Sequence, residues 1–218
     1  MDLLDAYPSL KQNVSLANHR ITLIGVSTVV WNAGRAYFEI SKPKYWRQDN
    51  DGNTLVGIGG IGGSIEAGES VLSCLRREIR EELGAQPVLE IPEVTYLIRD
   101  WAILDTLNLP PSRKRPTPLM IILMPPQLGG AQAPDHVAIV SFCTRLRSEP
   151  APHDVAGLLR VEGSTVSEFF SQDQWGLEEI ENHPGLALQL NSALPSGVRF
   201  FPTLTARAFQ LLVRAGYQ

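Results

Sequence analysis

Three glutamates are spaced so that they fall on one face of a short predicted helix. Glu78, Glu81 and Glu82 stand at positions i, i+3 and i+4, so at about 100° per residue they lie within roughly 100° of one another. Like charges on neighbouring turns repel, and a hard divalent cation would remove this repulsion because carboxylate oxygens are its preferred ligands. The spacing is therefore compatible with a metal site, although a solvated acidic helix face is the commoner reason for such a stretch.

The helix that would carry these glutamates has clear start and stop signals. Ser70 is a suitable N-cap and Gly84 a suitable C-terminal stop. Between them runs an apolar stripe that would face the core, made of Leu72, Leu75, Ile79 and Leu83. The pattern predicts a helix over residues 70–83, with the glutamates beside its core-facing stripe.

The residues around this helix resemble the signature of the Nudix hydrolase family. That signature is Gly, five residues, Glu, seven residues, Arg-Glu, an aliphatic residue, any residue, Glu-Glu, any residue, Gly and an aliphatic residue. All seven fixed residue types match within residues 63–85, at Gly63, Glu69, Arg77, Glu78, Glu81, Glu82 and Gly84. Ile79 fits its aliphatic position, whereas Ala85 is smaller than the usual residue. Outside this segment, only the order of strands and the position of the helix resemble the family.

The resemblance implies a metal centre that holds magnesium or manganese ions. Glu78, Glu81 and Glu82 are the expected metal-binding side chains, and the backbone at Gly62 would complete a metal shell through a carbonyl oxygen. The glycines there would let the backbone approach both metal and phosphate, because they have no Cβ.

The resemblance also implies catalytic and positioning roles. Glu78 is one candidate for the general base, Arg77 is expected to orient the glutamates, and Glu69 is expected to position Arg77. In some family members the base comes from a loop after the helix, and Glu168 and Asp173 are the candidates here. A solvated strand end and a helix start are the simpler explanations of those two acids.

The implied activity is that of an enzyme. A Nudix hydrolase cuts a pyrophosphate bond in a nucleoside diphosphate linked to another moiety, with a divalent metal, so the expected partner is a small nucleotide-type molecule. The alternative is a catalytically silent Nudix-fold module that binds or senses a nucleotide. Such modules usually lose carboxylates from the signature, and this chain retains all of them. The sequence identifies neither the substrate nor its binding residues, and the resemblance allows a homodimer.

Other motifs in the sequence are weaker indications of function. The run GIGGIG at 57–62 also fits the dinucleotide-binding fingerprint, but the acids about 20 residues later lie inside the predicted helix, which disfavours a Rossmann fold. Before the signature, where a base or phosphate could be contacted, stand Lys42, Lys44, Tyr45, Trp46 and Arg47. The basic residues 113–115 could clamp phosphates. Local packing and a solvated loop, respectively, are the more ordinary explanations.

Composition limits the remaining classes. The chain has 218 residues, 44% of them hydrophobic, and a net charge of −4, which predicts a folded core and argues against binding to long nucleic acids. Two cysteines, Cys74 and Cys143, exclude a disulfide scaffold and a Cys-rich zinc site and are expected to be reduced and packed. The longest apolar run, 21–31, is shorter than the roughly 20 residues of a membrane span. We therefore expect a cytoplasmic protein with no membrane partner.

Apolar and β-branched runs predict the strands that would surround the helix. They are residues 21–32, 36–42, 93–104, 118–125 and 136–146. Residues 55–63 begin as a strand and dissolve into glycines, residues 164–175 read as a short strand leading into a helix start, and 200–216 have helical spacing. Together with the resemblance, this order predicts an α/β (α+β) fold, a Nudix-type α/β/α sandwich with a mixed β-sheet. We expect an N-terminal extension over 1–20 and a Nudix hydrolase domain over 21–218.

Overall fold

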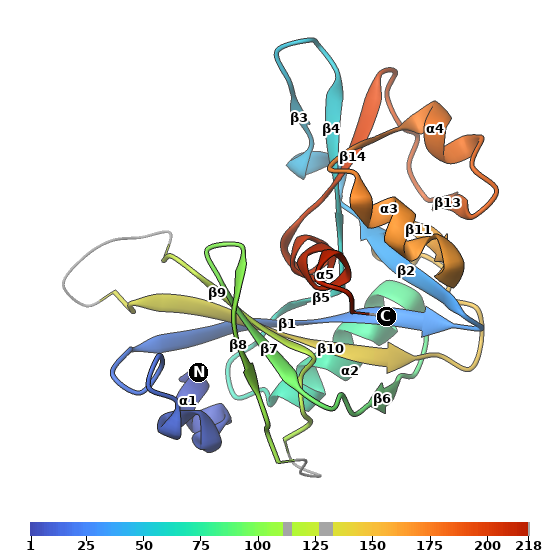
Figure 1. The fold of residues 1–218 in the computed structure, drawn as a ribbon. Helices are drawn as coiled ribbons and strands as arrows, with labels where there is room; N and C mark the ends of the chain where they lie inside the picture. Colours follow the sequence, from blue (N-terminus) through green and yellow to red (C-terminus); the bar gives the residue numbers. More distant parts are fainter. Residues whose placement is uncertain (111–114, 127–132, 218) are drawn as a thin grey trace.

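Strands dominate the fold and join in one mixed sheet (Figure 1). The structure is a computed structural model that describes residues 1–110, 115–126 and 133–217. In chain order the strands are β1 Ile21–Asn32, β2 Arg35–Ile40, β3 Arg47–Gln48, β4 Thr54–Gly59, β5 Ile61–Ser64, β6 Val88–Glu90, β7 Thr95–Arg99, β8 Ala102–Leu107, β9 Met120–Met124, β10 His136–Arg145, β11 Gly157–Glu162, β12 Trp175–Gly176, β13 Leu186–Leu190 and β14 Val198–Pro202. The α-helices are α1 Leu3–Ala6, α2 Val71–Leu83, α3 Val166–Ser171, α4 Leu177–Glu181 and α5 Leu204–Arg214, and short 3-10 turns occupy Pro8–Gln12, Pro43–Tyr45 and Gly163–Thr165.

The long strand β1 lies near the centre of the sheet. It pairs in parallel with β10 and antiparallel with β2 and β5. The main path through the sheet is β12-β14-β4-β2-β1-β10-β9-β7-β8, and β11 extends it by pairing with β2 and β13. Parallel pairs also join β14 to β4 and β7 to β9. The predicted mixed sheet is confirmed.

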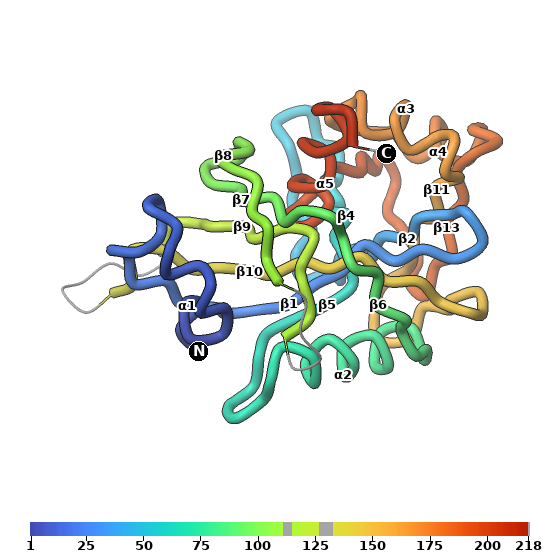
Figure 2. The backbone as a smooth tube through the Cα atoms, turned by 60° about the horizontal axis from the view of Figure 1, so that its bottom comes forward, coloured from blue at the N-terminus to red at the C-terminus, as the bar shows by residue number. Residues whose placement is uncertain are grey.

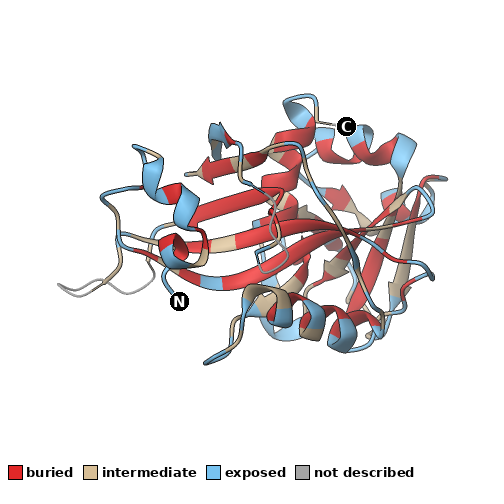
Figure 3. Ribbon diagram, turned by 90° about the horizontal axis from the view of Figure 1, so that it is seen from below, coloured by how far each residue is buried: buried red, intermediate tan, exposed pale blue. Residues whose placement is uncertain are grey.

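Helices cover both faces of the sheet, and a separate core lies on each face. In Figure 2, α2 lies on one side of the strands, and α3 and α5 lie on the other. Because side chains alternate along a strand, Val29 belongs to the core under α5 and Val30 to the core under α2. The strands between the two helical layers are mostly buried (Figure 3). This arrangement is the predicted α/β/α sandwich.

The ends of the chain take part in both cores. The N-terminal segment buries Leu3, Leu10 and Leu16 on the α2 side, and α5 buries Phe209 on the opposite side. The division at residue 20 stays a prediction. Both cysteines are buried and unbonded. Within the described ranges, no helix has the length and apolar character needed to cross a membrane.

The prediction for residues 164–175 is wrong in its order of elements. The helix α3 comes first, and the short strand β12 follows it. Val166, Phe169 and Phe170 are all buried, and their i, i+3, i+4 spacing is that of a helix face. This spacing outweighs the β-branched start of the segment.

The segment 93–104 folds as a hairpin rather than as one strand. β7 ends at Arg99 and β8 begins at Ala102, with a register shift between Leu97 and Ile98. Asp100 and Trp101 form the turn, with φ of 52° and 59°. The segment contains no glycine or proline that would indicate a turn, so the sequence predicted one continuous strand.

Candidate catalytic site

The helix α2 begins and ends where its capping residues predict. The Ser70 hydroxyl accepts a hydrogen bond from the Ser73 N–H at 3.2 Å, and Gly84 adopts the left-handed conformation with φ of 61°. Leu75 and Ile79 are fully buried against the sheet. Leu72 is only half-buried, and Cys74 takes its place in the core. The helix is therefore rotated so that part of its acidic face turns toward the sheet.

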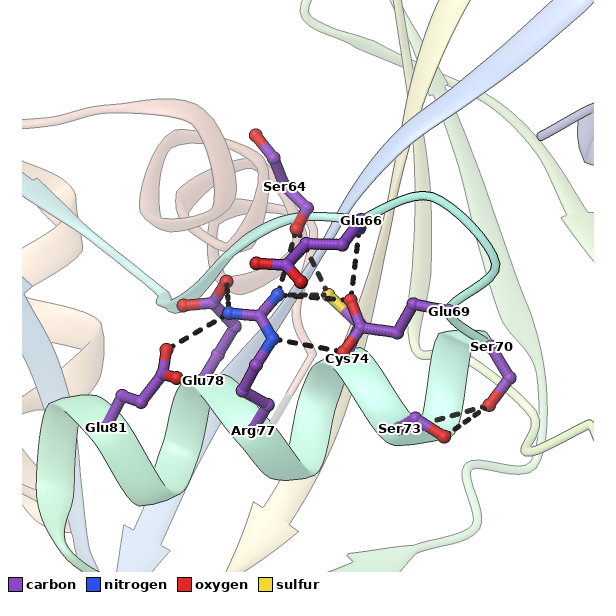
Figure 4. Close-up of polar contacts among 9 residues, drawn as sticks. All are labelled: Ser64, Glu66, Glu69, Ser70, Ser73, Cys74, Arg77, Glu78 and Glu81. Atoms are coloured by element: carbon purple, nitrogen blue, oxygen red, sulfur yellow. Dashed lines mark hydrogen bonds and ion pairs between the residues drawn. The ribbon is translucent and has the colours of Figure 1, made fainter.

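Arg77 is the centre of the polar network on this helix (Figure 4). Its Nε and Nη2 donate to the two carboxylate oxygens of Glu69 at 3.0 and 3.1 Å. Its Nη1 donates to Glu78 Oε1 at 2.8 Å and to Glu81 Oε2 at 3.0 Å, and Nη2 also reaches the Ser64 carbonyl at 3.1 Å. The contacts between Arg77, Glu69 and the glutamates expected from the signature are thus present.

The glutamates differ in their surroundings. Glu78 is 9% and Glu82 8% exposed, whereas the Glu81 side chain is 52% exposed. Glu82 Oε2 accepts a hydrogen bond from the Gly62 N–H at 2.9 Å. Glu78 lies against Gly63, where a Cβ atom would collide with its carboxylate. Glu78 and Glu82 thus lie against the glycine strand, the glycine-rich backbone of residues 59–63 in β4 and β5, whereas Glu81 is more exposed to solvent.

The glycine run at 55–63, expected to begin as a strand and then dissolve into glycines, stays in strands. It continues as β4 and β5 with a break at Gly60. A Cβ on Gly60 would lie 2.5 Å from Thr205 Cγ2, and one on Gly62 would collide with the Val26 carbonyl. Glycine is present because backbone and side chains approach closely on both faces. β5 leads to a loop before α2, so the context of a Rossmann fingerprint is absent from this segment.

The pKa values of the glutamates are shifted in different directions, down where hydrogen bonds from Arg77 dominate and up where burial dominates. Hydrogen bonds from Arg77 lower the pKa of Glu69 to about 2, and the same bonds raise the pKa of Arg77. Burial raises the pKa of Glu78 despite the hydrogen bond from Arg77. Burial and the negative charge of Glu39 raise the pKa of Glu82 well above its usual value. Glu78 and Glu82 are thus carboxylates whose negative charge is poorly compensated.

Glu39 is a half-buried carboxylate near these glutamates that the sequence analysis did not single out. It lies on β2. Burial raises the pKa of its carboxyl group, and the positive charge of Lys42 only partly opposes that rise. Lys42 Nζ is 3.0 Å from Asp154 Oδ2, and the loop of Asp154 is tied to α2 by its N–H, which donates to the Glu81 carbonyl at 3.3 Å. A lone carboxylate in an apolar strand was the available signal.

The donor set fits a hard divalent cation in its chemistry. Carboxylate oxygens are the preferred ligands of magnesium and manganese, and Glu78 lies in a cradle that a Cβ on Gly63 would fill. Across the described residues, no three acidic, histidine or cysteine side chains converge as a ready metal cage. Glu78 and Glu81 are directed to Arg77, and Gly62 offers its N–H to Glu82. The metal-binding roles of Glu78, Glu81, Glu82 and Gly62 stay a prediction.

The other acidic candidates lie away from α2. Glu168 is on α3, with its Oε1 3.3 Å from His183 Nε2. Asp173 lies 3.0 Å from Arg207 and 2.9 Å from Arg214, in the same region as α5. Because α3 and α5 cover the face of the sheet opposite to α2, the fold does not bring these acids to Arg77.

The candidate substrate contacts have mixed outcomes. Tyr45 is 62% exposed, and the Trp46 indole N–H donates to the Ser41 carbonyl, which is a local packing role. Lys42 is linked to α2, because it pairs with Asp154, whose N–H donates to the Glu81 carbonyl. In the basic stretch 113–115, the first two residues lie outside the described residues.

A mixed sheet between helices, with an acidic helix held by an arginine against a glycine strand, defines an α/β/α sandwich with a loop–helix–loop site. Comparison with protein-family models places a NUDIX domain over residues 24–155. The match covers more than half of the chain, and the chain belongs to the Nudix family. Family membership supports a hydrolase activity in general and a small nucleotide-type substrate.

Solved structures with a related fold are distant in sequence. The E. coli ORF135 protein is 13% identical, with a TM-score of 0.40 over 72% of this chain and 81% of that one. A NUDIX-family hydrolase from Clostridium perfringens is 17% identical, with a TM-score of 0.38 over 69% and 86%. The MutT NUDIX hydrolase from Burkholderia pseudomallei is 17% identical, with a TM-score of 0.34 over 88% and 96%. A search of curated proteins found no match.

Proposed function

We propose that this chain hydrolyses a pyrophosphate bond in a nucleoside diphosphate linked to another moiety, and that it requires magnesium or manganese. The observation that carries the proposal is the Arg77 network, which holds Glu69, Glu78 and Glu81 on one face of α2. A structural salt bridge would not need a further buried acid, yet Glu82 is buried beside them. Burying poorly compensated carboxylates costs free energy. A metal-dependent reaction would explain why these carboxylates are buried, because the bound cation would compensate their charge.

The residues divide the work by their contacts. Glu78, Glu81 and Glu82 would hold the cation, which when bound would neutralise pyrophosphate charge and acidify water. Glu78 is the candidate general base, because it is buried and its pKa is raised. Arg77 would orient Glu78 and Glu81, and Glu69 would fix the guanidinium in place. Location in the cytoplasm and assembly as a homodimer are further predictions.

The first prediction is a metal-dependent activity that requires the acidic side chains. Nucleoside triphosphates, oxidised nucleotides, ADP-ribose, dinucleoside polyphosphates and nucleotide sugars should be screened with and without magnesium. Glu81→Gln and Glu82→Gln should each lower turnover about a hundredfold, because charge stabilisation by the metal is worth several kcal/mol. Glu178→Gln on α4 removes an equal charge from an exposed position and should keep the wild-type rate.

Two results would contradict the proposal. Wild-type rates in Glu81→Gln and Glu82→Gln would remove these side chains from the mechanism. Nucleotide binding with no release of phosphate or nucleotide under any metal condition would instead identify the silent binding module.

A further inference from the structure

Glu39 lies on the same face of the sheet as the acidic helix. Its neighbours Phe38 and Ile40 point into the core under α5, and Tyr37 points into the core under α2. Because side chains alternate along a strand, Glu39 shares the α2 face with Tyr37. The carboxylate is therefore placed on the face that carries the Arg77 network, although it comes from a strand well before the signature.

The glycine strand brings Glu39 close to the helix glutamates. Glu39 pairs with Gly59 across β2 and β4, and a Cβ on Gly59 would lie 2.8 Å from Glu39 Oε1. A few residues along the same backbone, Gly62 donates to Glu82 and Gly63 lies against Glu78. Three carboxylates from two elements thus lie along one short run of glycine backbone, residues 59–63.

The Glu39 carboxylate has no hydrogen bond or ion pair among the residues that the structure describes. Lys42 is the cation that acts on Glu39, but its ammonium group is already paired with Asp154 at 3.0 Å. The Glu39 and Glu82 carboxylates lie along the same backbone, Glu39 at Gly59 and Glu82 at Gly62. A half-buried carboxylate that faces other carboxylates is costly unless a cation compensates it.

We propose that Glu39 is an additional carboxylate ligand of the divalent cation, contributed by β2 to the site formed by α2. This inference rests on the proposed function, because it assumes that Glu78 and Glu82 bind that cation. It extends the site beyond the signature, since residues 63–85 do not include β2. It also explains Gly59, whose lack of a side chain leaves room for the carboxylate.

The test is a manganese titration of the 218-residue chain, followed by the electron paramagnetic resonance signal of free manganese. Glu39→Gln should weaken manganese binding by at least about tenfold. Glu82→Gln is the positive control for the signature site, and Glu178→Gln is the matched control for loss of one negative charge. Thermal unfolding provides a second readout. Without metal, Glu39→Gln should unfold at the wild-type temperature or higher, and manganese should raise that temperature less than in the wild type.

The outcomes separate this inference from the proposed function. If Glu82→Gln binds manganese weakly and Glu39→Gln binds it as the wild type does, Glu39 is not a ligand and the signature site stands. If both variants bind as the wild type does, the proposed metal centre itself fails. Should Glu39→Gln not fold, anomalous scattering from wild-type crystals with manganese decides: an ion bonded to Glu39 supports the inference, and an ion held by α2 alone overturns it.

Discussion

At Arg77, one guanidinium group is shared among three carboxylates that would otherwise repel one another. Its planar fork gives Glu69 two hydrogen bonds and leaves Nη1 for Glu78 and Glu81. A lysine could not replace this arrangement, because an ammonium group is a point charge without fixed donor directions. The arginine therefore sets the direction of each carboxylate as well as compensating its charge. Removing Glu69 would leave the guanidinium held only by Glu78, Glu81 and the Ser64 carbonyl among the oxygen acceptors described.

The pH dependence of stability should reveal the bond between Glu69 and Arg77. The pKa of Glu69 falls from 4.5 to about 2 on folding, so this group stabilises the fold above pH 4.5 and loses that effect as the pH falls toward 2. The difference in unfolding free energy between wild type and Glu69→Gln, measured with denaturant, should shrink over this range. A difference that stays constant down to pH 2 would show that the bond contributes nothing.

How far the sequence predicts the site depends on where its residues lie in the chain. Glu69, Arg77 and the helix glutamates fall within one segment, so their spacing and helical geometry suffice to group them. Glu39 joins them only through the pairing of β2 with β4, and strand register is set by the whole sheet rather than by local spacing. Asp154 reaches the site through a loop that packs on α2, which again no local pattern announces.

Among the elements, those with strong local signals were predicted best. α2 has an N-cap, an apolar stripe and a terminal glycine, and its bounds differ from the prediction by one residue at the start. β11 and β13 were missed because their identity depends on pairing with β2 and with each other. The helix expected over 200–216 begins only at Leu204, because Val198–Pro202 is recruited by β4 as the parallel strand β14.

The hairpin between β1 and β2 contains a turn that can be improved. Ala33 and Gly34 form a two-residue loop with φ of 47° and 79°, and a left-handed conformation is unfavourable for alanine. Ala33→Gly should raise the unfolding free energy by about 0.5–1 kcal/mol. Ala102→Gly, in the exposed start of β8, should lower it, because there glycine only adds freedom to the unfolded chain. A lower stability of Ala33→Gly would contradict the left-handed turn.

At the scale of the whole molecule, the family match and the folded unit have different extents. The NUDIX domain match ends at residue 155, yet later residues supply β11 beside β2 and β14 beside β4. They also supply α5, whose Phe209 packs against Phe38 and Phe170 with ring centroids 6.2 and 5.5 Å apart. The glycine strand of the site is supported from this side, because Thr205 of α5 lies against Gly60. The site on the α2 face of the sheet therefore depends on α5, which covers the opposite face.

A chain shortened to residues 1–155 should consequently fail to fold. It would expose Phe38 and Ile58, which are fully buried in the complete chain, and each such side chain contributes about 1.5–3 kcal/mol when buried. Since a native domain is stable by only about 5–15 kcal/mol, losing the α5 layer and the strands β11 to β14 exceeds what the remaining core supplies. Circular dichroism during heating should show no cooperative transition, unlike that of the 218-residue chain. A sharp transition in the shortened chain would mean that residues 1–155 fold alone, and that the predicted domain over 21–218 is two units.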